Sequence, residues 1–461
     1  MKTDRFQSRL MRAARYAGTK KTAYLLMALG LTAGAAWGAD LVSVYRDAVA
    51  YDAPYAAAKA SLDAGREKLP QARAGLLPTV GLAANTVWND IDSTQRTTPP
   101  TDTAVKYNSN GWSVTLTQPL FRWQNWLGYN QSELLVAQAE AQFGSARLDL
   151  IVRVAQTYFD VLLAQEALAT TRAQKAAIGE QLESAKRNFE VGTATITDTH
   201  EAQSRYDLAA AQEIAAQSDL LVKRQALRMI VGKEHEALKG LKSSFQIGRP
   251  QPDNIDAWVE TAESGNPAVV ISRAGLEVAA LEAEKQRAGH YPTLDLVATR
   301  GRASQSGTLA LGVSRPGSDT DSTTIGVQLA FPIFSGGATV SKDREAVALR
   351  EKALADLENA RRTAALQVRQ TYLGVTSGLS QVKAYEAALT SSQLALESNK
   401  LGYDVGVRIN IDVLNAQGQL YDTRQKLAKA RLDTLAAQLK LKAAAGNLSE
   451  ADLAAINALL E

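Results

Sequence analysis

Few side chains in this sequence could carry out covalent, redox or metal chemistry. The 461 residues include no Cys, which excludes a thiol nucleophile, a thiolate metal site and an acylated-cysteine lipid anchor. The three histidines, His200, His235 and His290, lie far apart, and no GxxxxGK[ST] phosphate loop occurs. The sequence therefore predicts a protein that is not an enzyme and needs no metal or cofactor. An envelope hydrolase stays open as an alternative, because a triad scattered along the chain has no motif.

One pair of carboxylates recurs at a fixed spacing. Asp198 aligns with Asp412 when the second half of the chain is shifted by 213–214 residues. The same shift aligns several other segments in the same order: Pro119-Leu120-Phe121 with Pro332-Ile333-Phe334, Gln156-Thr157-Tyr158 with Gln370-Thr371-Tyr372, and Phe189-Glu190-Val191-Gly192 with Tyr403-Asp404-Val405-Gly406. This order predicts a structural unit of about 200 residues that was built twice.

The first 38 residues differ in charge from the rest of the chain. They hold seven Lys or Arg and one Asp, followed by the apolar run Ala23–Leu31 and several small residues. This pattern predicts a secretory signal peptide, since the apolar run is far shorter than the ~20 residues that a membrane anchor needs. Without this segment the net charge changes from +3 to −3. The remainder therefore offers no electrostatic case for binding nucleic acid.

Two stretches without proline, 120–249 and 333–461, predict long helices. Apolar residues recur in both at a spacing of three to four, which is typical of coiled-coil seams. Val191-Gly192 and Val405-Gly406 interrupt them, because glycine readily ends a helix. We therefore expect helical hairpins at 120–231 and 333–446.

Ahead of each hairpin the hydrophobic period changes from 3.6 to 2. Apolar and polar residues alternate within 79–118 and within 293–331, and this pattern predicts two strands in each unit. Polar loops at 91–110 and 301–322 are expected to join the strands of each pair. The predicted division of the chain follows: signal peptide 1–38, first repeat 39–231, linker 232–266, second repeat 267–446 and C-terminal segment 447–461.

The strands could belong to an ordinary half-buried sheet or to a transmembrane β-barrel. Four of the five Trp outside the signal peptide, Trp88, Trp112, Trp123 and Trp126, cluster where strands meet helix, as in an interfacial belt. Four strands cannot close a barrel, because single-chain barrels begin at 8 strands. The chain must then oligomerise, and two copies would supply 8 strands and three copies 12.

The two junctions Gln118-Pro119-Leu120-Phe121 and Phe331-Pro332-Ile333-Phe334, together with the run GYDVGVRINIDVLNAQ at 402–417, resemble the TolC family of outer-membrane channel proteins. The resemblance covers essentially the whole mature chain. It implies a mainly α protein with a small transmembrane β part: a homotrimer whose 12-stranded barrel crosses the outer membrane of a Gram-negative bacterium and continues into a periplasmic coiled-coil tunnel. Residues 232–266 and 447–461 would form an equatorial region.

The resemblance also implies where such a channel is gated. The hairpin tips at 191–198 and 405–412 correspond to the narrow periplasmic end, so a trimer would bring six carboxylates of Asp198 and Asp412 to one axis. Asp412 matches an entrance aspartate, whereas Asn415 replaces a second one and Glu201 is its counterpart in the first repeat. Positions whose hydrogen bonds and salt bridges hold the closed state correspond to Asp198, Tyr403 and Arg408.

The predicted gate therefore comprises Thr197, Asp198, Glu201, Tyr403, Arg408 and Asp412. The alternative is that these are solvated turn residues, with Thr197 or Asn410 simply capping a helix.

The function implied by the resemblance is an exit duct across the outer membrane. Such a duct contacts outer-membrane lipid and works with a periplasmic membrane-fusion adaptor and an inner-membrane ABC or RND-type pump. It exports proteins by type I secretion or small molecules by drug efflux. The alternative function is a periplasmic structural coiled-coil protein without a channel, which would explain the helices but not the strand pairs or the Trp cluster.

Overall fold

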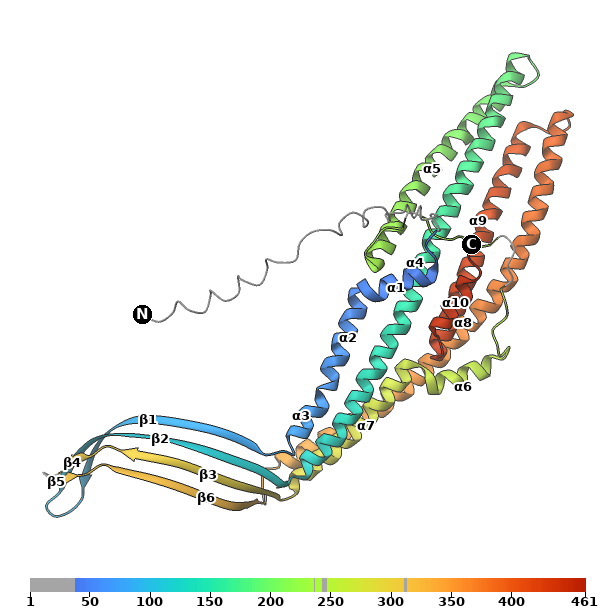
Figure 1. The fold of residues 1–461 in the computed structure, drawn as a ribbon. Helices are drawn as coiled ribbons and strands as arrows, with labels where there is room; N and C mark the ends of the chain where they lie inside the picture. The colour runs from blue at the N-terminus through green and yellow to red at the C-terminus, as the bar shows by residue number, and fades with distance from the viewer. Residues whose placement is uncertain (1–37, 236, 243–246, 311–312) are drawn as a thin grey trace, which may run out of the picture.

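The computed structural model describes residues 38–235, 237–242, 247–310 and 313–461, so the predicted signal peptide lies outside it except for Gly38. Figure 1 shows an elongated molecule in which long helices run alongside one another and end on a narrow, curved sheet. The elements in chain order are α1 (Leu41–Tyr51), α2 (Ala53–Arg66), α3 (Lys68–Ala74), β1 (Thr79–Gln95), β2 (Thr101–Phe121), α4 (Trp123–Glu190), α5 (Ile196–Val231), α6 (Ile255–Gly265), α7 (Pro267–Arg287), the 3₁₀ helix η1 (Ala288–His290), β3 (Thr293–Gln305), β4 (Thr308–Ala310), β5 (Val313–Arg315), β6 (Ser318–Ala330), α8 (Ala338–Asp404), α9 (Asn410–Ala445) and α10 (Glu450–Asn457).

Two long helices, α4 and α8, run the length of the helical part, about 100 Å at ~1.5 Å per residue. On one side of α4, the helices α2 and α3 pack along its half near the sheet. Helix α5 packs along the distant half of α4. Between α4 and α8, α7 fills the near half and α9 the distant half. The layer of helices therefore has α2 and α5 at one edge and α8 at the other. No helix among the described residues is both long enough and apolar enough to cross a bilayer.

Each long helix ends in a tight turn at glycine. Helix α4 stops at Glu190 and is followed by Gly192 with φ of 80°, and α8 stops at Asp404 and is followed by Gly406 with φ of 78°. A side chain at either position would be strained, because L residues other than glycine rarely adopt positive φ. The chain reverses at these turns, at the glycines where the sequence predicts the helices to break.

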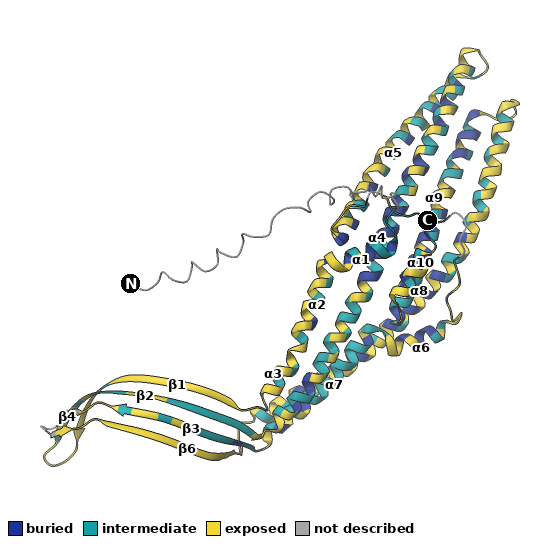
Figure 2. Cartoon of the chain, viewed as in Figure 1, coloured by how far each residue is buried: buried dark blue, intermediate teal, exposed yellow. Residues whose placement is uncertain are grey.

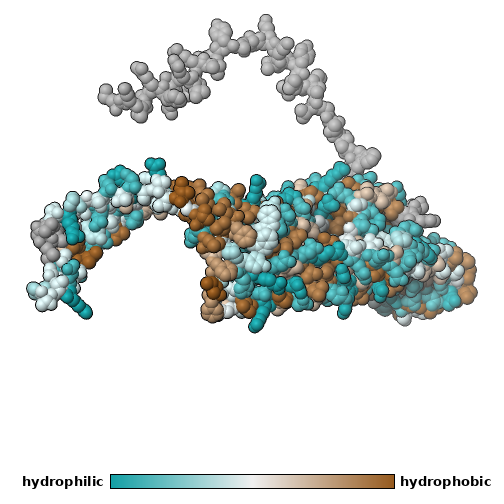
Figure 3. Space-filling model, turned by 90° about the horizontal axis from the view of Figure 1, so that it is seen from below, coloured by the Kyte–Doolittle hydropathy of each residue, from teal (hydrophilic) through white to brown (hydrophobic). Residues whose placement is uncertain are grey.

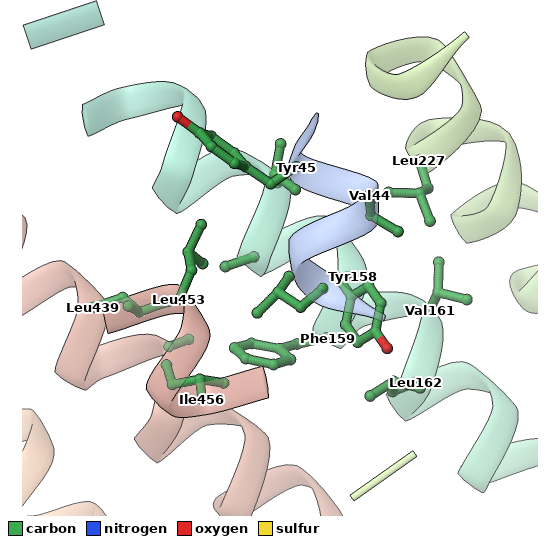
Figure 4. Close-up of a cluster of buried hydrophobic side chains, with 14 of the residues drawn as sticks. Val44, Tyr45, Tyr158, Phe159, Val161, Leu162, Leu227, Leu439, Leu453 and Ile456 are labelled. Carbon is green, nitrogen blue, oxygen red and sulfur yellow. The ribbon is translucent and has the colours of Figure 1, made fainter. Parts of the chain in front are cut away.

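The largest hydrophobic core lies at mid-height, where the short helices meet the long ones. Figure 4 shows this cluster, which draws side chains from α1, α4, α5, α9 and α10: Val44, Tyr45, Tyr158, Phe159, Val161, Leu162, Leu227, Leu439, Leu453 and Ile456. Full burial of one such aliphatic or aromatic side chain contributes roughly 1.5–3 kcal/mol. This core therefore joins both repeats and the C-terminal helix into one body.

The segments outside the repeats wrap around the same level. Leu238 forms a β-bridge with Ala39, and Leu241 forms one with Leu460. This short stretch of the linker therefore contacts both the residues before α1 and those after α10. The buried Tyr158 hydroxyl donates to the carbonyl oxygens of Ala39 (3.1 Å) and Lys239 (2.8 Å). These contacts fix the linker and the C-terminal segment around the middle of the helices.

The linker also docks on α8. The Tyr372 hydroxyl donates to a carboxylate oxygen of Asp253 at 2.8 Å, and the Arg249 guanidinium donates to the other at 3.0 Å. These two bonds hold the pKa of Asp253 below its ordinary value. The carboxylate therefore stabilises the docked linker while it is ionised.

The main sheet contains four antiparallel strands in the order β1-β2-β3-β6. Strands β2 and β3, one from each repeat, pair at its centre, so β1 and β6 are its edges. At its helical end, Arg122 before α4 makes a bidentate ion pair with the buried Asp295 of β3, with distances of 2.8 and 2.6 Å. This pair fixes the angle at which the longest helix leaves the sheet.

The strands are longer than the sequence predicts, so the loops expected at 91–110 and 301–322 are wrong. Strands β1 and β2 stay paired from Thr79 with Thr117 up to Gln95 with Thr101, leaving a turn of only a few residues. Strands β3 and β6 stay paired up to Gln305 with Ser318, and the small hairpin β4–β5 lies beyond them. The outer halves of these strands carry polar residues on both faces. Because apolar and polar residues do not alternate there, the sequence pattern does not indicate strands.

Candidate functional site

The two hairpin tips gather the predicted gate residues at the end of the molecule that is farthest from the sheet (Figure 1). Thr197, Asp198 and Glu201 lie in the first two turns of α5. Tyr403 lies in the last turn of α8, Arg408 in the turn, and Asp412 in the first turn of α9.

Asp198 is bonded within its own tip. Its carboxylate accepts hydrogen bonds from the backbone amide (3.0 Å) and the hydroxyl (2.7 Å) of Thr195, whose hydroxyl in turn accepts from the Asp198 amide. This reciprocal capping box contributes roughly 1 kcal/mol to the start of α5. The suggestion that Thr197 caps this helix is therefore wrong, because the cap residue is Thr195 and Thr197 lies inside the helix.

The second tip is arranged differently. Arg408 lies 3.6 Å from the Asp412 carboxylate, an exposed pair of the kind that contributes only ~0.3–0.5 kcal/mol. The residue before α9 is Ile409, which offers no side-chain cap, so Asn410 does not cap this helix either. Among the described residues, Arg408 and Asp412 therefore pair with each other and form no ion pair with the first hairpin.

Asn410 joins the two hairpins. Its side chain is 1% exposed, its amide nitrogen donates to the Asp198 carbonyl oxygen at 3.3 Å, and its amide oxygen accepts from Gln181 Nε2 at 2.6 Å. One residue of α9 is thus bonded to both α4 and α5. A second link lies nearby, where Asn188 Nδ2 donates to the Tyr403 hydroxyl at 3.0 Å.

Sequence reasoning did not identify Gln181, Asn188 and Asn410 as tip residues that link the hairpins. A usable signal was present for Asn410, which shares a three-to-four spacing with three other buried residues: Val413, Leu414 and Gln417. A buried amide almost always has hydrogen-bond partners. The pattern therefore indicates a polar contact on the packed face of α9, although the partner cannot be read from it.

The remaining predicted residues make few contacts. Thr197 is exposed, Glu201 is half-buried, and neither side chain forms a hydrogen bond with another described residue. Asn415, the uncharged replacement, accepts a hydrogen bond from Arg205 at 3.0 Å. Among the described residues no group of three or more His, Asp or Glu is placed to hold a metal ion.

Farther along the first hairpin, one carboxylate ties its two helices together. Glu213 of α5 accepts from Lys175 and Arg172 of α4, both at 3.0 Å. These two cations hold the pKa of Glu213 below its ordinary value. This carboxylate therefore ties α4 to α5 about halfway along the first hairpin.

The sheet has one apolar face and one polar face. Cross-strand partners share a face, and the row Val80, Leu116, Ala298 and Ile325 runs across all four strands on one side. The next row, Gly81, Thr115, Thr299 and Thr324, lies on the other side. Figure 2 shows how much of this sheet is exposed, so none of the residues that the structure describes forms a layer over the apolar face.

Aromatic side chains mark both ends of the apolar face. Exposed aromatics gather at the helical end: Phe121, Trp123, Trp126, Tyr291, Phe331 and Phe334. Figure 3 shows hydrophobic residues concentrated at this junction and more polar residues toward the far end of the sheet. Trp112 and Trp88 are exposed farther out along β2 and β1. Two aromatic girdles around an apolar band are typical of sheets that face lipid.

Long helical hairpins joined to such a sheet are the fold of outer-membrane channels. The crystal structure of the CmeC outer membrane channel of Campylobacter jejuni aligns with a TM-score of 0.75, covering 91% of this chain and 90% of that one at 17% identity. A family model described as outer membrane efflux protein matches residues 44–233 and 258–447, and the chain belongs to this family.

Relatives of known role agree with this family. The chain is 33% identical over 438 residues to the outer membrane protein TolC of Vibrio cholerae, covering 95% of this chain and 98% of TolC. It is 35% identical over 423 residues to the alkaline protease secretion protein AprF of Pseudomonas aeruginosa, covering 91% and 86%. The protein is an outer-membrane exit duct for protein secretion or efflux, and its relatives are channels rather than enzymes.

Proposed function

We propose that three copies of this chain form one continuous duct, with a 12-stranded barrel in the membrane and a helical tunnel in the periplasm. The observation that carries the proposal is the pair of open sheet edges, β1 and β6, which are exposed along almost their full length. Each unpaired backbone group costs several kcal/mol in lipid. Pairing β1 of one copy with β6 of the next removes every edge. A periplasmic coiled-coil protein would leave these edges and the apolar face in water.

The edges of the helical layer support the same assembly. Helices α5 and α8 lie at opposite edges, and each carries exposed apolar side chains along its length: Leu208, Ile214, Leu221, Val222 and Met229 on α5, and Val340, Leu349, Leu354, Leu366, Leu373, Leu394 and Leu401 on α8. Contact between α5 of one copy and the distant half of α8 in the next would bury the α5 stripe together with Leu373, Leu394 and Leu401. The tunnel would then close around the same axis as the barrel.

The hairpin tips form the gate of the assembled duct. Three copies bring Asp198 and Asp412 together as six carboxylates, with Thr197 and Glu201 beside them at the entrance. Tyr403 and Arg408 tie neighbouring hairpins in the closed state, and the cation-binding ring is weakened because Asn415 carries no charge. Opening then requires each second hairpin to move away from the first, against the contacts of Asn410 and Tyr403.

The duct works with a periplasmic adaptor and an inner-membrane ABC or RND-type pump, because no motif for nucleotide hydrolysis is present in the chain. The relatives AprF and PrtF are named for protease secretion, which supports protein cargo. The outer membrane efflux family, to which the chain belongs, supports small molecules. A deletion strain scored for protease export and for drug sensitivity separates the two cargo classes.

Chemical cross-linking tests the assembly directly. Leu208 of α5 and Leu394 of α8 are both exposed and lie at similar distances from their hairpin tips. The chain has no Cys, so Leu208→Cys with Leu394→Cys and a flexible bis-maleimide should give a covalent trimer on a denaturing gel. Either single variant is the matched control and should stay monomeric. A double variant that labels at both sites yet stays monomeric would contradict the proposal.

A further inference from the structure

The apolar face of the sheet ends at two arginines. In the cross-strand register Val114 of β2 lies opposite Arg300 of β3, and Trp112 lies opposite Arg302. Residues two apart on a strand share a face, so both guanidinium groups lie on the same side of the sheet as Leu116 and the rest of the apolar rows. The face therefore changes from apolar to cationic within one step of the pleat.

The charges beyond this step have a definite order. Arg302 is paired with Asp319 at 2.7 Å, and Ser304 donates to the same carboxylate at 2.6 Å. Asp321 lies opposite Arg302. Arg300 is exposed and has no carboxylate within ion-pair distance among the described residues. From the helical end outward, the face thus presents apolar side chains, then the unpaired Arg300, then a layer in which cations and carboxylates are mixed.

The height of Arg300 matches the outer interface of a bilayer. Arg300 follows Leu294, at the helical end of β3, by six positions, about 20 Å of strand. A barrel strand tilted by about 40° rises ~15 Å over this length, and a long arginine side chain reaches several Å farther. An arginine that faces lipid costs little near an interface and roughly 2–4 kcal/mol at the midplane. The guanidinium is therefore placed at the level of lipid headgroups.

We propose that Arg300 binds a phosphate of the phosphorylated glycolipid that forms the outer leaflet of the outer membrane. A guanidinium offers paired N–H donors that match two phosphate oxygens, and the exposed Trp112 beside it packs at the same interface. Three such sites surround the assembled barrel. The inference rests on the proposed barrel, because it takes the apolar face to be the one that meets lipid.

The test measures lipid retained by the purified, detergent-solubilised assembly in native mass spectrometry. The probes are lipid A, lipid A stripped of its phosphates, and inorganic phosphate. We expect the parent to bind lipid A at least about tenfold more tightly than the dephosphorylated form, as a charge-assisted bond predicts. Arg300→Gln should abolish this preference, and Arg300→Lys, which keeps the charge but not the paired donors, should retain part of it. Arg315→Gln, in the outer hairpin, is the matched control and should bind as the parent does.

Equal binding of both lipid A forms by the parent, or an Arg300→Gln variant that binds as the parent does, would overturn the inference. Displacement of lipid A by inorganic phosphate at equal concentration would also overturn it, by showing a general anion site. Conductance in planar bilayers distinguishes failure of the lipid-binding inference from failure of the proposed duct. Arg300→Gln should conduct as the parent does, because the duct does not depend on this lipid contact. A parent that forms no oligomer would contradict the barrel itself.

Discussion

The side-chain amide of Asn410 is buried where the two hairpins pack against each other. Its two bonds, to Gln181 and to the Asp198 carbonyl, join neutral groups, so they do not change with pH. When the hairpins separate, each buried partner left without a bond costs ~1–3 kcal/mol unless water replaces it. We infer that this residue raises the free energy of opening in every chain of the assembly.

A single atom change converts this contact into a pH-sensitive one. In Asn410→Asp a carboxylate oxygen faces the Asp198 carbonyl, which repels it, whereas a protonated acid donates to it as the amide does. Burial raises the pKa of such a carboxyl above the ordinary ~3.9. Conductance in planar bilayers should exceed that of the parent near pH ~7.5 and fall back toward it near ~4.5.

The control for this variant is Asn399→Asp, which adds the same charge to the same hairpin. Within the described part of the chain, the amide of Asn399 bonds only to the Ala395 carbonyl of its own helix, at 2.8 Å. Its conductance should follow that of the parent at both pH values. If Asn410→Asp also follows the parent while the assembly stays intact, Asn410 does not hold the gate.

The two recurring aspartates should respond differently to removal. Asp198→Ala deletes the capping box with Thr195, costs ~1 kcal/mol at the start of α5 and should raise conductance by loosening the first tip. Asp412→Ala removes only an exposed pair with Arg408, so it should instead weaken block by multivalent cations. Titration of the current with a trivalent cation compares the two. Identical block curves for both variants would contradict these separate roles.

The latch residues inferred from the family give a third comparison. Tyr403→Phe with Arg408→Ser removes the hydroxyl that accepts from Asn188 and the cation that pairs with Asp412. This double variant should conduct more than the parent. An unchanged conductance in an intact assembly would show that these residues are not latches.

The sequence reveals these residues unequally. Asp198 and Asp412 stand out because they recur at the repeat spacing, and Tyr403 and Arg408 lie in the motif that resembles the family. Gln181 and Asn410 are more than 200 positions apart, and nothing local in the chain indicates that they touch. Their contact depends on how α9 packs against α4, which only the folded structure specifies.

At the level of elements, the alternating strands were predictable only where one face is apolar. Leu116, Ala298 and Ile325 alternate with small polar residues and share one row of the sheet. Beyond Trp112 both faces carry polar side chains, so there is no alternation to read, and polar runs such as 101–110 still form strands. The helices were easier to predict, because the absence of proline and the three-to-four spacing persist over many turns.

Arginine substitutions on the strands test which face meets lipid. Val327 lies opposite Leu296 inside the apolar band, and Val327→Arg should cost ~2–4 kcal/mol. Gln328→Arg points to the other face and should cost much less. Denaturant unfolding of the protein in lipid vesicles measures both. Val114 is a weaker test position, because its register partner is already Arg300. Equal costs at Val327 and Gln328 would mean that this face does not meet lipid.

At the scale of the whole molecule, the two halves of the chain have the same arrangement of helices and strands. Helices α2, α4 and α5 in the first repeat correspond to α7, α8 and α9 in the second, and each repeat contributes one edge strand and one central strand to the sheet. A single chain therefore ends in open edges on both sides, at the sheet and along the helices. The sequence predicts the repeat and the need to oligomerise, whereas the two matching edges are visible only in the fold.

The mass of the particle extracted from outer membranes in mild detergent tests this account most directly. Native mass spectrometry should find three copies of the mature chain, because three four-stranded sheets close into 12 strands and leave no edge in lipid. A particle of two copies, which would supply 8 strands, or a monomer that is soluble without detergent would contradict the account.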